Sequence, residues 1–190
     1  MKLLQKLVLE QTAGKNVLSL GCIGYRNINE QYSLLLKNAA SLFGIDKNLE
    51  EMKKLNHETI TYGDLNQFTW FDKTKFKNID VIVCTEVVEH LKYPLQTLEY
   101  IKKNKKKETL LVLSVPNGTS LGRTIHGIFN TKTFSFQDRN HLAVHSKRTI
   151  SNLCSEAGLE VMNIKPYARK KLVSLIPFQH LGSGFFVLCK

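Results

Sequence analysis

The segment 84–90, which reads CTEVVEH, places two carboxylates and an imidazole directly after an apolar run. The three side chains belong to Glu86, Glu89 and His90, and a carboxylate at the end of a buried strand is costly unless a partner compensates its charge. If residues 86–91 are helical, the three side chains fall at i, i+3 and i+4 on one face. Such a group could bind a metal ion, transfer a proton or only cap a helix.

His141, in the segment RNHL, is the candidate for a fourth member of this group. It precedes a helix expected at 146–157, and its loop should fold over the same edge of the sheet. Two carboxylates and two imidazoles can hold a divalent cation, which would lower the pKa of a bound hydroxyl and orient it. Without a metal, His90 or His141 would remove the proton, because neutral imidazole is a base suited to neutral pH. Metal binding, metal-free acid–base work and a purely structural cap all stay open.

Apolar runs and helical patterns alternate along the chain, and these elements must position the polar side chains. Helices are expected at the N-terminus and at 146–157, where Ser146 can cap the helix and Gly158 can end it. Further helices are expected at 30–40, 48–54 and 94–103. Strands are expected at 15–20, 41–45, 59–62, 79–84, 110–115, 159–164 and 184–189. This alternation predicts an α/β protein with a largely parallel sheet and helices on both faces.

Acidic residues recur just past the expected strands. Asp46 and Asp64 follow the second and third strands, as Glu86 follows the fourth. Ligands of open parallel sheets bind beyond the carboxyl ends of the strands, where an acid can accept hydrogen bonds from both hydroxyls of a ribose. Asp46 is suited to that role, although it could instead cap the next helix. Asp64 could contact a ligand or be a turn residue after Gly63.

Length and composition indicate one globular domain. The chain has 190 residues, of which 43% are hydrophobic and 23% charged. No run approaches the ~18 apolar residues of a membrane span, and the N-terminus does not read as a secretory signal. Four separated cysteines without a CxxC pair favour a reducing, cytoplasmic location over a zinc site or disulfide framework. The net charge of +11 favours anionic partners.

Six segments, taken in order, resemble motifs of the class I S-adenosylmethionine-dependent methyltransferases, here of the type 11/23 kind with an EVxEH run. The segments are VLSLGCIGY, FGID, YGDL, DVIVCTEVVEHL, LVLSVPNG and NHLAVHSKRTISNLCSEAGLEV. The resemblance implies a Rossmann-like sheet of seven strands in the order 3-2-1-4-5-7-6, with the last strand, 184–189, antiparallel. It also implies a single methyltransferase domain over residues 1–190, with a small cap insertion at about 119–140.

The same resemblance implies S-adenosylmethionine as the cofactor and a set of residues that bind it. They are Gly21, Cys22, Gly24, Asp46, Lys47, Asp64, Leu65, Thr85 and Glu86. The glycine loop departs from the family pattern, since Ser19 stands where an acid is usual and Ile23 where a second glycine is usual. Either Gly24 takes that role or the loop is one residue shorter, which is similar to a subset of methyltransferases near polysaccharide clusters.

The resemblance predicts an enzyme that transfers a methyl group to oxygen. The first choice of acceptor is a sugar or other small-molecule hydroxyl in bacterial glycan or related biosynthesis. The alternative is an RNA 2′-O-methyltransferase, because Glu86, Glu89, His90 and His141 resemble the ligands that small-RNA 3′-terminal enzymes place around Mg²⁺ or Mn²⁺. The EVxEH run is also shared with ubiquinone-pathway O-methyltransferases. In either case the catalytic residues are expected among these four.

Two further hypotheses concern other parts of the chain. The stretch 167–178, YARKKLVSLIPF, could rest on an anionic membrane surface and meet a lipid-linked acceptor, or could simply connect the last two strands. A third functional hypothesis comes from Ser19 and Ile23. A loop that departs this far from the family pattern could belong to a non-catalytic domain that binds the cofactor weakly or not at all.

Overall fold

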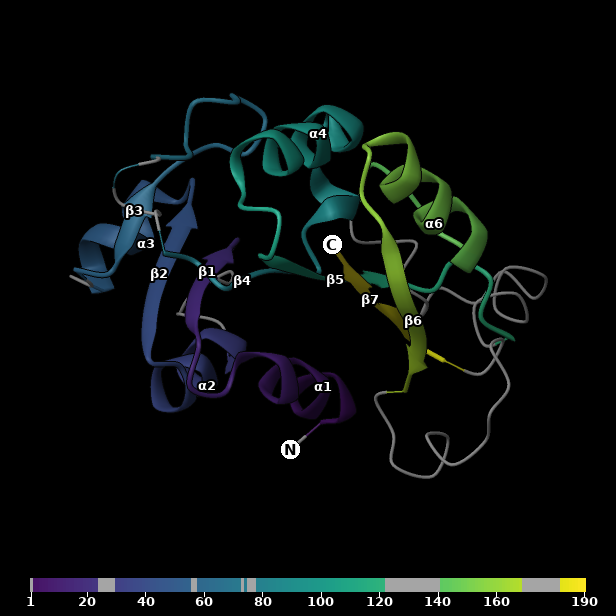
Figure 1. Cartoon of the computed structure of the whole chain (residues 1–190), viewed down its shortest axis with the longest axis horizontal. Coiled ribbons are helices and arrows are strands. Elements are labelled where there is room, and N and C mark those ends of the chain that lie inside the picture. The colour runs from purple at the N-terminus through teal and green to yellow at the C-terminus, as the bar shows by residue number, and fades with distance from the viewer. Residues whose placement is uncertain are drawn as a thin grey trace.

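Seven strands form one sheet in the computed structural model shown in Figure 1. The structure describes residues 2–23, 30–55, 58–72, 74, 78–121, 141–168 and 182–190. The strands are β1 (Asn16–Leu20), β2 (Ser41–Asp46), β3 (Ile60–Tyr62), β4 (Val81–Thr85), β5 (Leu110–Pro116), β6 (Val161–Tyr167) and β7 (Gly184–Cys189). Their order is β3-β2-β1-β4-β5-β7-β6, which confirms the predicted topology.

The centre of the sheet is parallel, and its far edge is not. β1 pairs in parallel with β2 on one side and with β4 on the other. β7 runs antiparallel to both β5 and β6, as predicted for the last strand. Because β1 and β4 are neighbours, the segments that follow them lie side by side at the carboxyl edge of the sheet, where ligands of such folds bind.

Helices cover both faces of the sheet. They are α1 (Leu3–Thr12), α2 (Glu30–Asn38), α3 (Leu49–Leu55), the 3₁₀ helix η1 (Val88–His90), α4 (Pro94–Asn104) and α6 (Lys147–Glu156). Figure 1 shows α1 and α2 on one side of the sheet and α4 and α6 on the other. Each pair buries its own apolar cluster, with Val8 and Leu35 in the first and Leu98 and Ile150 in the second.

Local signals in the sequence explain where α4 begins and where α6 begins and ends. α4 has Pro94 in its first turn, where a missing backbone N–H costs nothing. The Ser146 hydroxyl accepts a hydrogen bond from the Thr149 backbone N–H at 3.1 Å, which caps α6. Gly158, just past the end of α6, has a φ of 73°. The residues that predicted these helices therefore lie at the beginning of α4 and at both ends of α6.

Two predicted segments fall largely outside the described residues. Only 119–121 of the cap insertion expected at 119–140 are described, and only 167–168 of the basic stretch 167–178. Within the described residues, no helix is both long enough and apolar enough to cross a lipid bilayer.

Gly44 in β2 allows the first loop of the protein to pack closely on the sheet. A Cβ at this position would lie 2.7 Å from the Cys22 sulfur and 3.0 Å from a ring carbon of Tyr32. Cys22 and Tyr32 are both fully buried, so neither can move away without disturbing tightly packed neighbours. A small residue at 44 is therefore required for the turn that follows β1 to sit where it does.

We expect Gly44→Ala to lower the free energy of unfolding by about 1–3 kcal/mol, because the added methyl overpacks a filled site. Urea unfolding measures the change. A Cys22→Ala substitution in the same chain should recover part of the loss, because it removes the nearest atom. Gly158→Ala is the control, since its Cβ enters open space and only its positive φ should cost about 1–2 kcal/mol. Wild-type stability of Gly44→Ala would contradict the close packing.

Candidate functional site

A hollow of about 190 Å³ is lined by residues at the end of β2 and by residues that follow β1, β2, β3 and β4. Of the predicted cofactor residues, its wall contains Gly21, Asp46, Lys47, Asp64, Leu65 and Glu86. Gly24 lies outside the described residues. The structure therefore gathers six of the nine predicted residues around one space, although they come from four separate loops.

Asp46 is a buried carboxylate in the wall of this hollow, with 7% of its surface exposed. Oδ2 accepts a hydrogen bond from the backbone N–H of Ile23 at 2.9 Å, and Oδ1 accepts one from the N–H of Asn48 at 2.9 Å. The residue that caps α3 is Asn48, whose Oδ1 accepts from the Glu51 N–H at 3.2 Å. Helix capping therefore does not account for Asp46, whose carboxylate has further acceptor positions for a ligand.

The turn after β1 approaches the segment after β4 very closely. Gly21 has a φ of 66°, and its N–H donates to the Ile45 carbonyl at 2.9 Å. A Cβ on Gly21 would lie 2.5 Å from a methyl carbon of Val87. Cys22 turns its thiol into the core, where burial and then the negative charge of Asp46 raise the pKa of that thiol to about 12. Cys22 can therefore reach a cofactor through its backbone rather than through its thiol.

The loop after β3 is fixed by side-chain hydrogen bonds of its own. Asp64 Oδ1 accepts from the backbone N–H of Asn66 at 3.0 Å, so this carboxylate does act in a turn while it lines the hollow. Asn66 Oδ1 in turn accepts from the Lys92 N–H at 2.8 Å, which ties the loop to the segment after η1. The Leu65 carbonyl accepts from the Thr97 hydroxyl at 3.1 Å. These bonds position Leu65 in the wall of the hollow.

Glu86 does not belong to the helix that follows it. Its φ is 55°, and η1 begins only at Val88, so residues 86–91 are not one helix and the condition for a common helical face is not met. The reason is that the Glu86 N–H still donates to the Ser114 carbonyl at 3.0 Å and to the Ser114 hydroxyl oxygen at 3.1 Å. The contact with β5 thus extends one residue beyond β4, and the chain turns at Glu86 instead of starting a helix there.

The Glu86 carboxylate is held by two hydroxyl side chains from distant parts of the chain. Oε1 accepts a hydrogen bond from the Tyr167 hydroxyl at 2.6 Å and from the Ser114 hydroxyl at 3.0 Å. Burial, and then the negative charge of Glu86, raise the pKa of Tyr167 well above its usual value, so the phenol keeps its proton and donates it. Tyr167 pairs with Gly184 across β6 and β7, and a Cβ on Gly184 would collide with the phenol oxygen.

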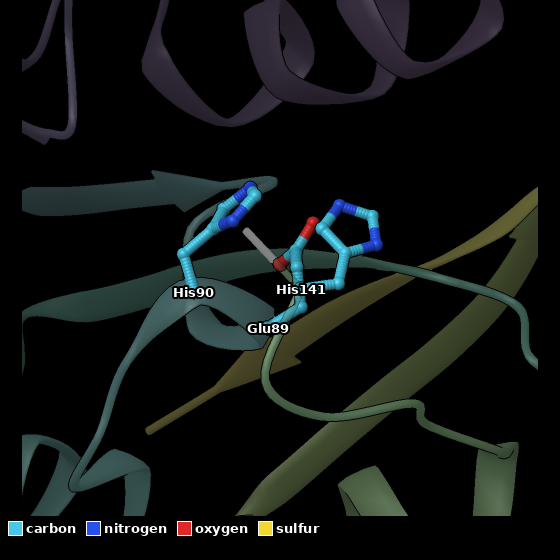
Figure 2. A group of neighbouring side chains, drawn as sticks. All are labelled: Glu89, His90 and His141. Atoms are coloured by element: carbon cyan, nitrogen blue, oxygen red, sulfur yellow. The ribbon is translucent and has the colours of Figure 1, made fainter. Parts of the chain in front are cut away.

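Glu89, His90 and His141 form a separate group, shown in Figure 2. One potential ligand atom from each lies within 4.8 Å of the others. The Glu89 side chain is 1% exposed, and the rings of His90 and His141 are 4.7 Å apart between centroids. The Glu89 carbonyl accepts hydrogen bonds from the N–H groups of Leu142 at 2.7 Å and Ala143 at 3.2 Å, which hold the His141 loop in place.

This group borders the hollow, because His90 also lines its wall. Three of the four residues predicted as a metal or catalytic set are therefore brought together, and Glu86 is placed with Tyr167 instead. One carboxylate and two imidazoles are a donor set that fits a divalent cation, and they are equally a donor set for proton transfer.

The strand order agrees with comparisons to other proteins. The chain matches the model of a methyltransferase domain family over residues 1–164. A search of curated proteins finds no match. Similar solved structures include an S-adenosylmethionine-dependent methyltransferase from Aquifex aeolicus, which is 17% identical with a TM-score of 0.62, the match covering 99% of this chain and 89% of that chain.

Two other structures are similar to the same degree. A methyltransferase from Thermotoga maritima, described as a possible histamine N-methyltransferase, is 13% identical with a TM-score of 0.68, covering 98% of this chain and 86% of that chain. The cyclase SpnF is 13% identical with a TM-score of 0.66, and the match covers 98% of this chain and 80% of that chain. Such low identities show the fold alone. The family match, which spans most of the sequence, shows that the chain belongs to the methyltransferase domain family, with the fold of the class I S-adenosylmethionine-dependent enzymes.

Proposed function

We propose that the protein is an S-adenosylmethionine-dependent methyltransferase that modifies a hydroxyl of a sugar or another small molecule. The observation that carries the proposal is the hollow at the carboxyl edge of the sheet, with the buried Asp46 carboxylate in its wall. A buried carboxylate that lines a cavity is stabilised by hydrogen-bond donors, and the two hydroxyls of a ribose supply a matching pair.

The residues of this hollow suit the parts of the cofactor. Asp46 would bind the ribose, and Asp64 with the buried Leu65 would lie at the adenine. The backbone of the tight turn at Gly21, Cys22 and Ile23 would lie along the amino-acid part, which requires the close approach that a glycine permits. When bound, the cofactor supplies a methyl group on a positively charged sulfur. The protein contributes the relative placement of this methyl group and the acceptor oxygen.

His90 is the favoured base for the acceptor hydroxyl, because it lines the hollow and lies in the group with Glu89 and His141. A neutral imidazole can take the proton near neutral pH. The buried Glu89 carboxylate beside it would stabilise the imidazolium that forms. His141 can take the same role in a different acceptor pose. This is the metal-free form of the proposal.

The second candidate function is an RNA 2′-O-methyltransferase in which Mg²⁺ or Mn²⁺ binds to the group of Glu89, His90 and His141. Two observations support it. These three residues already converge, and the net charge of +11 would favour an anionic substrate. A bound cation would lower the pKa of the ribose hydroxyl and orient it.

The cytoplasmic location and a membrane contact through 167–178 stay predictions.

Binding of S-adenosylhomocysteine should raise the unfolding temperature. At about 100 times its dissociation constant, the ligand adds about 2.7 kcal/mol, which corresponds to roughly 5–10 °C for a domain of this size. Asp46→Asn should weaken binding by about tenfold to a hundredfold, because a charge-assisted hydrogen bond is lost. Asp64→Asn should weaken the binding of S-adenosylhomocysteine less, since an amide oxygen can still accept a hydrogen bond from the backbone N–H of Asn66. No shift with the wild type would leave the third hypothesis, a non-catalytic domain.

Under the second candidate function, Mn²⁺ should bind at a 1:1 ratio, and His141→Ala should lose this binding because it removes one of three converging ligands. Isothermal titration measures the affinity, and a chelator should abolish activity. Glu86→Gln is the matched control, since Glu86 is held by Tyr167 and Ser114 and should leave Mn²⁺ affinity within about threefold. If the wild type binds no Mn²⁺ at millimolar concentration, the metal-dependent function is excluded and the metal-free form remains.

A further inference from the structure

A second hollow, of about 320 Å³, lies beside the first. Its wall comes from the start of α1, the start of α2, the end of β4 and the end of β6, and it includes Lys2, Gln5, Gln31, Thr85, Glu86 and Tyr167. In Figure 1 the beginning of α1 points toward the lower end of β6, which is where Tyr167 lies. The volume of this second hollow is within the range of small-molecule sites.

Glu86 is the one described residue that lines both hollows. The turn at a φ of 55° puts it in that position, and the Tyr167 and Ser114 hydroxyls hold its Oε1 there. Methyl transfer needs the acceptor oxygen on the opposite side of the methyl group from the sulfur, in line with the bond that breaks. An acceptor must therefore occupy a space that adjoins the cofactor hollow, and the second hollow adjoins it at Glu86.

The wall of the second hollow offers both donors and acceptors of hydrogen bonds beside apolar surface. Lys2 and Glu30 at its rim form an ion pair at 2.8 Å, which leaves little positive charge to attract a phosphate. The side-chain nitrogen of Gln31 is buried and, within the described part of the chain, has no hydrogen-bond partner. A ligand that accepts from Gln31 gives this nitrogen a partner, and it can also donate to the Glu86 carboxylate, which already accepts from Tyr167 and Ser114. Hydroxyls do both, whereas an ammonium group only donates.

We propose that the second hollow is the acceptor subsite, that it takes an uncharged polyhydroxylated group such as a hexose ring, and that Tyr167 is a positioning residue for Glu86. The inference rests on the proposed methyl transfer and names its substrate class. The Glu86 carboxylate accepts a hydrogen bond from a ring hydroxyl next to the reacting one and so orients the ring. As the new oxygen–carbon bond forms, the carbon–sulfur bond breaks with its electron pair staying on sulfur, and the proton of the reacting hydroxyl passes to His90, which lines the adjoining cofactor hollow.

Tyr167 and Ala168 of this hollow lie beyond the family match, which ends at residue 164. The contact of Tyr167 with Glu86 depends on the pairing of Tyr167 with Gly184, which leaves room for the phenol to cross to Glu86.

The test is ligand-observed NMR on the full chain saturated with S-adenosylhomocysteine, with three probe sets: methyl hexosides, simple phenols and primary amines. Methyl hexosides should bind the wild type, and Gln31→Ala and Tyr167→Phe should each weaken them about tenfold, as expected for one lost hydrogen bond. The affinity for S-adenosylhomocysteine should not change. The matched controls are Gln96→Ala and Tyr93→Phe, which alter exposed residues outside both hollows and should bind hexosides as the wild type does.

Several outcomes would overturn the inference. Binding of phenols or amines alone, or of no probe at all, would reject an acceptor subsite for polyhydroxylated groups. If Gln31→Ala weakens S-adenosylhomocysteine but not methylthioadenosine, which lacks the amino-acid chain, the hollow holds the amino-acid end of the cofactor. Equal hexoside affinity of Tyr167→Phe and the wild type would remove the positioning role. Failure of the proposed methyl transfer itself looks different, because the wild type then binds no S-adenosylhomocysteine.

Discussion

The turn at Glu86 is the constraint on which the arrangement of the site depends. A residue with a side chain pays roughly 1–3 kcal/mol for a positive φ, and such a cost persists only where the surroundings impose it. Here the backbone N–H of Glu86 is held by Ser114, and its carboxylate is held by Ser114 and Tyr167. The turn keeps Glu86 out of the group of Glu89, His90 and His141, while Glu86 and His90 still line the same hollow.

The architecture was predictable from the sequence because most of its signals are local. Pro94 and Ser146 mark the beginnings of α4 and α6, and Gly158 marks the end of α6. Apolar runs of the right length predicted the strands, and their alternation with helices predicted a parallel sheet. The order of strands and the antiparallel direction of β7 came from the family resemblance, since no local signal states which strands pair.

The candidate site was predictable in part, for the same reason. Asp46 ends a strand, Asp64 and Glu86 each follow one, and parallel strands bring such positions to one edge. The positive φ of Glu86 was not predictable, because glutamate favours helices and the following residues fit a helical pattern. Tyr167 was missed because 81 residues separate it from Glu86, and the pairing of β6 with β7 decides the contact. Gly184, the first residue of β7, is the local sequence feature that reflects this contact.

The two hollows differ in how their walls are built, and this bears on what a sequence can reveal about them. The cofactor hollow uses loops that each follow directly on a strand, from Gly21 to Leu91, so each contribution has a local signal. The second hollow joins the starts of α1 and α2 to the end of β6, and these meet only through tertiary packing. Recognition of a methyltransferase therefore follows from the order of motifs. Choice of acceptor depends on side chains such as Gln31 and Tyr167, whose surroundings are decided by the packing of distant segments.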